Sequence, residues 1–185
     1  SDAERLLEEL KRISEETKRR LAETNKKVKK IMKELTETLT ETNKKLKKII
    51  DDLRDRIDKI KDKETLRRVL DEADKRLRKS LREDEELVRR AEKRLRDTLR
   101  EDERIVRESE KRLRELLERL ERRGVEERVL KELRRLLERN REELRRNKEK
   151  HKELVERIKR RLEENKERHK RLVDEARKEL KEKEK

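Results

Sequence analysis

Apolar residues recur every three or four positions along most of the chain, and Lys, Arg and Glu fill the positions between them. This spacing is typical of amphipathic helices. Three such stripes follow one another, from Leu6 to Ile60, from Leu66 to Leu120 and from Val129 to Leu180. We therefore predict three helices at about 2–61, 64–122 and 125–183, each of roughly 60 residues.

Two short interruptions separate the stripes. Asp62 is a favoured residue type at a helix N-cap, and Gly124, the sole glycine, follows an Arg-rich turn of the kind that ends a helix. Connections this short place consecutive helices antiparallel. Because a single stripe cannot be buried alone, we predict an all-α fold, an up-down-up three-helix bundle that forms one domain over residues 1–185.

Each predicted helix contains an internal repeat of eighteen residues. Residues 23–36 recur at 41–54, residues 81–98 at 99–116, and residues 147–162 at 165–180. Eighteen residues make about five turns at 3.6 residues per turn, so the apolar stripe runs straight along the helix axis. We expect a straight, untwisted bundle with helices roughly 90 Å long.

The composition excludes several classes of site. Of the 185 residues 62% are charged, the net charge is +15, and the chain has one Gly and no Cys, Pro, Phe, Tyr or Trp. Such composition is typical of disorder, but sustained helical periodicity argues against it. Thiolate metal sites, Gly-rich phosphate loops and aromatic base-stacking platforms are ruled out. Without a long apolar run we expect no membrane span and no signal peptide, hence a soluble chain suited to cytoplasmic expression whose compartment is undefined.

Polar side chains interrupt the apolar stripes at positions predicted to be buried. They are Thr17, Thr24, Asn25, Thr42, Asn43, Ser80, Asp84, Thr98, Asp102, Ser109, Asn140, Asn147, His151, Asn165 and His169. A buried polar group is costly unless it is hydrogen-bonded. We therefore interpret these residues as a buried hydrogen-bond network.

Antiparallel pairing about the two turns aligns the polar residues in three layers that cross all three helices. The layers are Thr17–Ser109–Asn140, Thr24–Asp102–Asn147 and Thr42–Asp84–Asn165. Replacing a whole layer by apolar residues is expected to preserve stability, whereas Asp84→Leu alone leaves its donors unpaired.

The two histidines lie one turn beyond the aspartate layers, nearest Thr98 and Ser80. Helical side chains lean toward their own N-terminus, so we expect charged pairs between His151 and Asp102 and between His169 and Asp84. In the competing arrangement each His is neutral, accepts from Asn147 or Asn165, and has a lowered pKa. Catalysis is not expected, because no accessible nucleophile lies beside them. The histidines are roughly 27 Å apart and cannot share a metal; no metal or cofactor is expected.

The repeat, the layered polar residues and the surface of Glu, Lys and Arg together resemble de novo designed, parametrically generated helical bundles with buried hydrogen-bond networks. The resemblance covers the whole chain. It implies a coiled-coil-like scaffold in which buried polar layers fix helix pairing and register, as well as the possibility of a pH response or of assembly.

The leading functional hypothesis is a designed structural scaffold without enzyme activity, a monomer that requires no partner. The alternatives are a component of a designed assembly, with itself or with a designed partner chain, a pH-responsive protomer, and a weak nonspecific nucleic-acid binder. Specific nucleic-acid binding is not expected, since basic and acidic residues are interspersed along every face.

Overall fold

A computed structural model describes residues 2–124 and 126–183, apart from the side chains of residues 3, 176, 179, 180 and 183. It contains three α-helices, α1 (Asp2–Lys59), α2 (Lys63–Arg122) and α3 (Glu127–Lys183). The described residues include no strand. The predicted all-α fold with three long helices is confirmed. The side chain of the predicted core residue Leu180 and the predicted helix start at Val125 lie outside the described part of the chain.

The helix ends follow local chemistry. Asp62 caps α2: its Oδ2 accepts hydrogen bonds from the Thr65 hydroxyl (2.8 Å) and the Thr65 backbone N–H (3.4 Å). The hydroxyl hydrogen bond holds the pKa of the Asp62 carboxyl below its usual value. After α2, Gly124 adopts a φ of 66°, which favours glycine. The Glu126 carbonyl then accepts the N–H of Val129 (3.0 Å), and α3 begins at Glu127.

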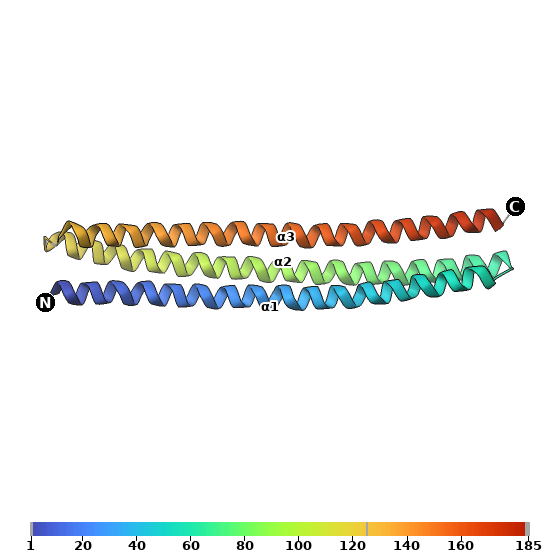
Figure 1. Cartoon of the computed structure of the whole chain (residues 1–185), viewed down its shortest axis with the longest axis horizontal. Coiled ribbons are helices and arrows are strands. Elements are labelled where there is room, and N and C mark those ends of the chain that lie inside the picture. Colours follow the sequence, from blue (N-terminus) through green and yellow to red (C-terminus); the bar gives the residue numbers. More distant parts are fainter. Residues whose placement is uncertain (1, 125, 184–185) are drawn as a thin grey trace. The chain divides into compact units, whose positions relative to one another are not determined.

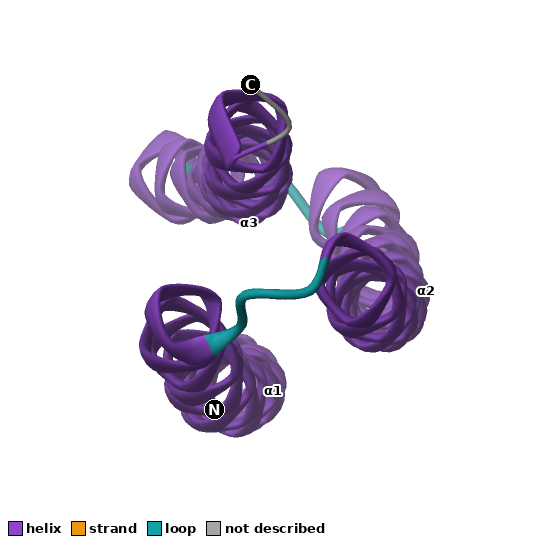
Figure 2. Cartoon of the chain, turned by 90° about the vertical axis from the view of Figure 1, so that its right-hand side faces the viewer, coloured by secondary structure: helices purple, strands orange, loops and turns teal. Residues whose placement is uncertain are grey.

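The chain divides into two compact units, and each contains a segment of all three helices. Unit 1 comprises Ser1–Ile31 and Lys93–Leu154, and unit 2 comprises Met32–Glu92 and Val155–Lys185. Within each unit α1 and α3 run in the same direction and α2 runs the opposite way (Figure 1). Figure 2, with the α1–α2 connection of unit 2 facing the viewer, shows the helices at the corners of a triangle. Each helix therefore faces the other two.

The apolar stripes form the core of each unit. In unit 1 all three helices contribute fully buried residues, such as Ile13 from α1, Leu113 from α2 and Leu133 from α3. In unit 2 α1 and α2 again bury their stripes, but α3 packs less deeply. Its Ile158 is buried, whereas Leu162, Leu172 and Val173 are only half-buried. Because α3 packs more loosely in unit 2, a space remains there between α1 and α3.

Ion pairs join α3 to α2 in both units and repeat every eighteen residues. In unit 1 the pairs are Arg141–Glu110 (3.0 Å) and Lys148–Glu103 (3.4 Å). In unit 2 they are Lys159–Glu92 (3.7 Å), Lys166–Glu85 (3.0 Å) and Arg177–Asp74 (3.9 Å). Between α1 and α3 of unit 2, Arg54 and Glu175 form an ion pair at 3.8 Å.

Candidate functional site

The layer nearest the α2–α3 connection contains hydroxyl and amide groups. Thr17 Oγ1 lies 2.9 Å from Ser109 Oγ and 2.8 Å from the Ile13 carbonyl oxygen, so its single proton is donated to one of the two. Asn140 Nδ2 donates to Ser109 Oγ at 2.9 Å. Thr17 and Ser109 are buried and Asn140 is half-buried. The structure thus brings these three residues together, one from each helix.

The next layer of unit 1 is centred on Asp102, which is fully buried. Its Oδ1 accepts a hydrogen bond from the Thr24 hydroxyl, which also contacts the Leu21 carbonyl oxygen at 2.8 Å. Its Oδ2 accepts from Asn147 Nδ2 at 3.1 Å. One carboxyl group therefore links α1, α2 and α3. Burial raises the pKa of Asp102, and the hydrogen bonds from Thr24 and Asn147 partly oppose that shift.

In the corresponding layer of unit 2, the side chains do not form such hydrogen bonds. Thr42 donates to the Leu39 carbonyl oxygen at 2.9 Å. Neither oxygen of Asp84, nor Asn165 Nδ2, has a hydrogen-bond partner among the described residues, although all three atoms are buried. Burial raises the pKa of Asp84, an effect that the nearby Thr42 hydroxyl partly offsets. The sequence predicts correctly the level of this layer along the helices, but its side chains do not form hydrogen bonds with one another.

The two histidines do not form the expected charged pairs. His151 is buried, and its Nδ1 has no hydrogen-bond partner in the described part of the chain. His169 Nε2 lies 3.5 Å from Asp74 Oδ1, without the alignment of a hydrogen bond, instead of pairing with Asp84. The expected His169–Asp84 pair is therefore wrong. Asp74 lies about three turns from Asp84 on α2, toward the α1–α2 connection, and His169 reaches it instead.

Burial shifts the pKa of both histidines in the same direction. It lowers the pKa of His151, which the charge of Asp102 only partly offsets, and it lowers the pKa of His169, which Asp74 partly offsets. The charged-pair prediction required a raised histidine pKa and a lowered aspartate pKa, so it is wrong in both directions. The neutral-histidine alternative agrees with these directions. Its expected hydrogen bonds from Asn147 and Asn165 do not form, because Asn147 Nδ2 donates to Asp102 and Asn165 Nδ2 has no partner among the described residues.

The remaining predicted polar residues line the edges of the layers. Thr98 is buried and donates to the Arg94 carbonyl oxygen at 2.9 Å. Asn25, Asn43 and Ser80 are half-buried. Sequence reasoning missed Asp74 and the other α2–α3 ion pairs. A signal existed, because their acidic positions on α2 and their basic positions on α3 recur at the same eighteen-residue spacing as the layers.

The described residues contain no cluster of three or more His, Asp or Glu side chains that could hold a metal ion. None of the described helices is long and apolar enough to cross a membrane.

Comparison with solved structures identifies a similar protein described as a computationally designed three helix bundle. The TM-score is 0.73, with 99% of this chain and 93% of that chain covered, at 17% sequence identity. This chain is a three-helix bundle. No protein-family model and no curated protein sequence matches it. At this identity the likeness establishes the fold alone.

Proposed function

We propose that this three-helix bundle is a designed structural scaffold without catalytic activity, in which buried polar layers set the register of the helices. The observation that carries the proposal is Asp102, a single buried carboxyl group that accepts hydrogen bonds from α1 and α3. Such a group contributes little net stability compared with well-packed apolar residues, but misaligned helices leave it unpaired at a large cost. Its main effect is therefore to disfavour other registers.

The absence of native cysteines allows a direct test of register. Thr17 and Ser109 touch across α1 and α2, so Thr17→Cys with Ser109→Cys reports the native register. Thr17→Cys with Leu113→Cys reports a shift of α2 by one turn. Both pairs are placed in the native chain and in a chain with Thr24→Val, Asp102→Leu and Asn147→Leu. Disulfide formation is measured in a glutathione redox buffer, and stability is measured by urea unfolding.

We expect the native layer to allow only the Thr17→Cys/Ser109→Cys disulfide. The layer-replaced chain should form both disulfides to a comparable extent while keeping or raising its urea midpoint. If the layer-replaced chain formed only the native disulfide, the layers would not be what sets the register.

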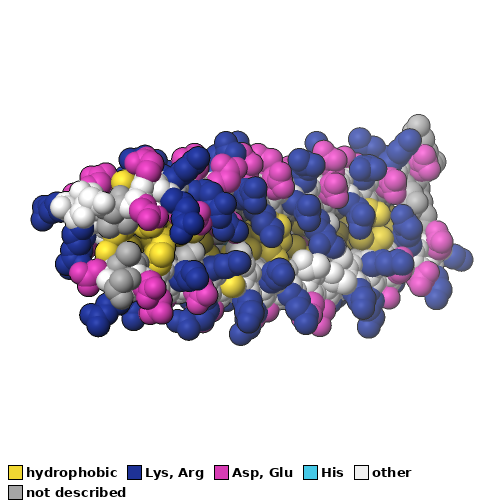
Figure 3. Space-filling view, turned by 60° about the vertical axis from the view of Figure 1, so that its left-hand side comes forward, with side chains coloured by type: hydrophobic (Ala, Val, Ile, Leu, Met, Phe, Trp, Pro, Cys, Tyr) yellow, Lys and Arg dark blue, Asp and Glu magenta, His cyan; other side chains and the backbone are white. Residues whose placement is uncertain are grey.

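We further propose that the scaffold is monomeric and needs no partner. No large apolar side chain is exposed among the described residues. On the face shown in Figure 3, Lys and Arg side chains are interspersed with Asp and Glu, and apolar side chains are visible between them along the middle of the face. Interspersed charges of both signs offer no concentrated basic patch for nucleic acid. The absence of exposed large apolar side chains among the described residues disfavours a partner that binds through apolar contacts.

A further inference from the structure

One level of the unit 2 sequence pattern has small residues on two of the three helices. Antiparallel pairing assigns three residues to this level, Leu53, Ala73 and Ala176. One repeat away, the corresponding residues are Leu35, Ala91 and Ile158. The repeat thus keeps the leucine of α1 and the alanine of α2, but it exchanges isoleucine for alanine on α3. The pattern therefore supplies less apolar volume at this level than at the level of the buried Ile158.

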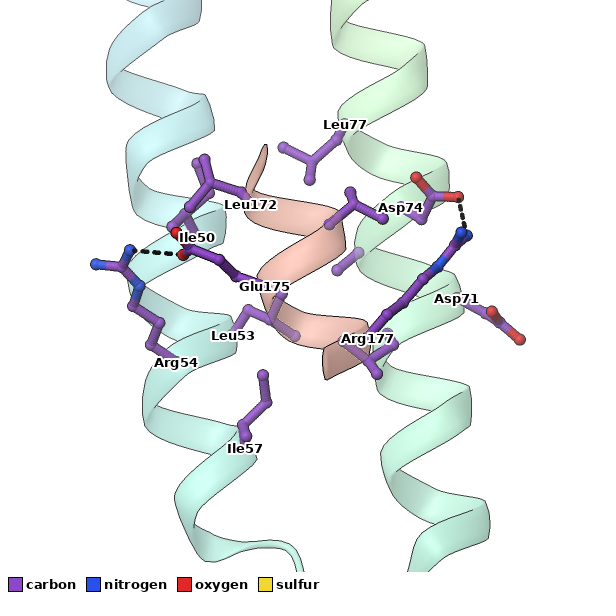
Figure 4. A pocket seen from close by; sticks show the side chains of 13 residues that line it. Ile50, Leu53, Arg54, Ile57, Asp71, Asp74, Leu77, Leu172, Glu175 and Arg177 are labelled. Atoms are coloured by element: carbon purple, nitrogen blue, oxygen red, sulfur yellow. Dashed lines mark ion pairs between the residues drawn. The ribbon is translucent and has the colours of Figure 1, made fainter. Parts of the chain in front are cut away.

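A cavity of about 40 Å³ lies beside Ala73 in unit 2 (Figure 4). All three helices contribute apolar side chains to its walls, among them Leu53, Ile57, Ala73, Leu77, Leu172 and Val173. The first four of these residues are buried, whereas Leu172 and Val173 of the less deeply packed α3 are half-buried. The cavity is thus a gap in the apolar core where α3 does not fill the space against α1 and α2.

Most of the charged side chains that line the cavity are paired with one another. Arg54 and Glu175 lie 3.8 Å apart on one side, and Arg177 and Asp74 lie 3.9 Å apart on the other (Figure 4). Asp71 also lines the cavity, but its carboxyl group points away from the apolar side chains. A buried water needs two to four polar partners, and the leucine, isoleucine and alanine side chains of the walls offer none. The cavity therefore favours an apolar occupant.

The volume restricts this occupant to a single small particle. An engineered apolar cavity of about 150 Å³ binds benzene or xenon, and the cavity of unit 2 has roughly a quarter of that volume. It is therefore suited to the smaller of these two ligands. Wall atoms that face an empty space lack dispersion partners on that side, and a polarizable xenon atom supplies them. An apolar ligand that enters such a preformed, poorly hydrated space binds favourably.

The groove between α1 and α3 gives access to the cavity. This groove has a volume of about 730 Å³, and Ile50, Leu77 and Leu172 line both spaces. A small apolar particle can therefore pass from solvent along the groove and reach the cavity while the helices stay folded.

We propose that the cavity beside Ala73 is a binding site for one small apolar atom or molecule of the size of xenon, held by dispersion contacts with Leu53, Leu77 and Leu172. The site uses no hydrogen bond and no charge, and it is independent of the proposed scaffold role and of the polar layers.

Methyl NMR of the full chain under increasing xenon pressure tests this site. We expect the methyl signals of Leu77 and Leu172 to shift saturably, with one dissociation constant. The methyl signals of Ile13 and Leu133, in the core of unit 1, should show no saturable shift. Helium at the same pressures is much less polarizable, so it controls for pressure itself and should shift neither set saturably.

Two matched substitutions separate filling of this cavity from a general change of the core. Ala73→Val adds two methyl groups to the cavity wall and should weaken xenon binding at least about tenfold, because the added groups occupy the space. Its urea midpoint should equal or exceed that of the native chain, as is usual when a cavity is filled. Ala91→Val makes the same change one repeat away, and it should leave the xenon dissociation constant unchanged.

Shifts that never saturate, equal saturable shifts in both units, or equal weakening of xenon binding by Ala73→Val and Ala91→Val would overturn the proposal. If either variant fails to fold by circular dichroism, the comparison of the two cores in the native chain decides the matter.

Discussion

Asp84 and Asp102 show how one residue type behaves differently at two equivalent positions of a repeat. Both carboxyl groups are fully buried, and burial raises the pKa of each. Asp102 accepts two side-chain hydrogen bonds, whereas Asp84 accepts none from the described residues. The free energy of unfolding should therefore respond in opposite directions when each is replaced.

Asp102→Leu should lower the free energy of unfolding by about 2 kcal/mol, since it leaves the buried Asn147 amide without its acceptor, whereas the Thr24 hydroxyl can still donate to the Leu21 carbonyl oxygen. Asp84→Leu should raise it by about 1–3 kcal/mol, because it removes an unpaired buried polar group. The layer pattern alone predicted that Asp84→Leu would leave its donors unpaired, but neither oxygen of Asp84 accepts a hydrogen bond from the described residues, and the nearby Thr42 hydroxyl donates to the Leu39 carbonyl oxygen. Urea unfolding of the two variants checks this; equal destabilisation by both would show that Asp84 is paired in solution.

The histidines give a pH dependence with a defined sign. Burial lowers the folded-state pKa of His151 and of His169 below the ordinary 6.5. Their stabilising contribution is thus complete above the unfolded pKa and is lost as the pH falls through the lowered folded value. The aspartates act oppositely: their raised pKa adds stability as the pH falls toward their ordinary 3.8.

We therefore expect a lower urea midpoint at pH 5 than at pH 7. The double variant His151→Gln/His169→Gln, which is neutral at both positions, should lose most of this difference. His151→Gln alone should account for more of it than His169→Gln alone, because a protonated His169 can pair with Asp74, 3.5 Å away. If the double variant kept the whole difference between pH 5 and pH 7, the histidines would not be its source.

At the scale of the helices, α3 is the element whose packing differs most between the units. Ion pairs join it to α2 in both units, but the Lys and Arg partners are exposed to solvent and each pair contributes little stability. Its depth is set instead by apolar contacts, which are fewer in unit 2, where Leu162, Leu172 and Val173 are half-buried. The periodic pattern predicted which face of α3 points inward, but not how closely that face approaches α1.

The α2–α3 connection depends on a single backbone conformation. Gly124 has a φ of 66°, and a Cβ at this position would meet no atom within 4 Å. Gly124→Ala should therefore lower the free energy of unfolding by about 1–2 kcal/mol through backbone strain alone. Gly124→Asn should cost less, because Asn tolerates the left-handed region. Thermal unfolding measures both, with Glu126→Ala as an exposed control; an Ala variant as stable as the native chain would contradict this account.

At the scale of the whole molecule, a net charge of +15 and the absence of exposed large apolar side chains in the described part favour a monomer. Light scattering at pH 7 should give the mass of one chain, 23.1 kDa. Because protonation of the histidines adds positive charge, the same mass is expected at pH 5. Twice that mass at either pH would favour the alternative of a component of a designed assembly.

The sequence by itself determined the secondary structure and the inward-facing residues. Three uninterrupted stripes, a capping Asp62 and a turn at Gly124 are local features, and local hydrogen bonds and side-chain periodicity act on them directly. The sequence also determined the level of each polar layer along the helix axes, because antiparallel helices of regular rise have a fixed register. Thus Thr24, Asp102 and Asn147 could be grouped from their positions alone.

Only the tertiary structure decided which of these polar groups meet. The repeat gives Asp84 and Asp102 the same neighbours in sequence, yet Asn147 bonds to Asp102 while Asn165 does not bond to Asp84. The two layers differ in the packing around them, because the apolar residues of α3 are less buried in unit 2 than in unit 1. A hydrogen bond is lost when its donor and acceptor move apart by a fraction of an ångström. A small shift of α3 is therefore enough to separate a hydrogen-bonded layer from one without such bonds.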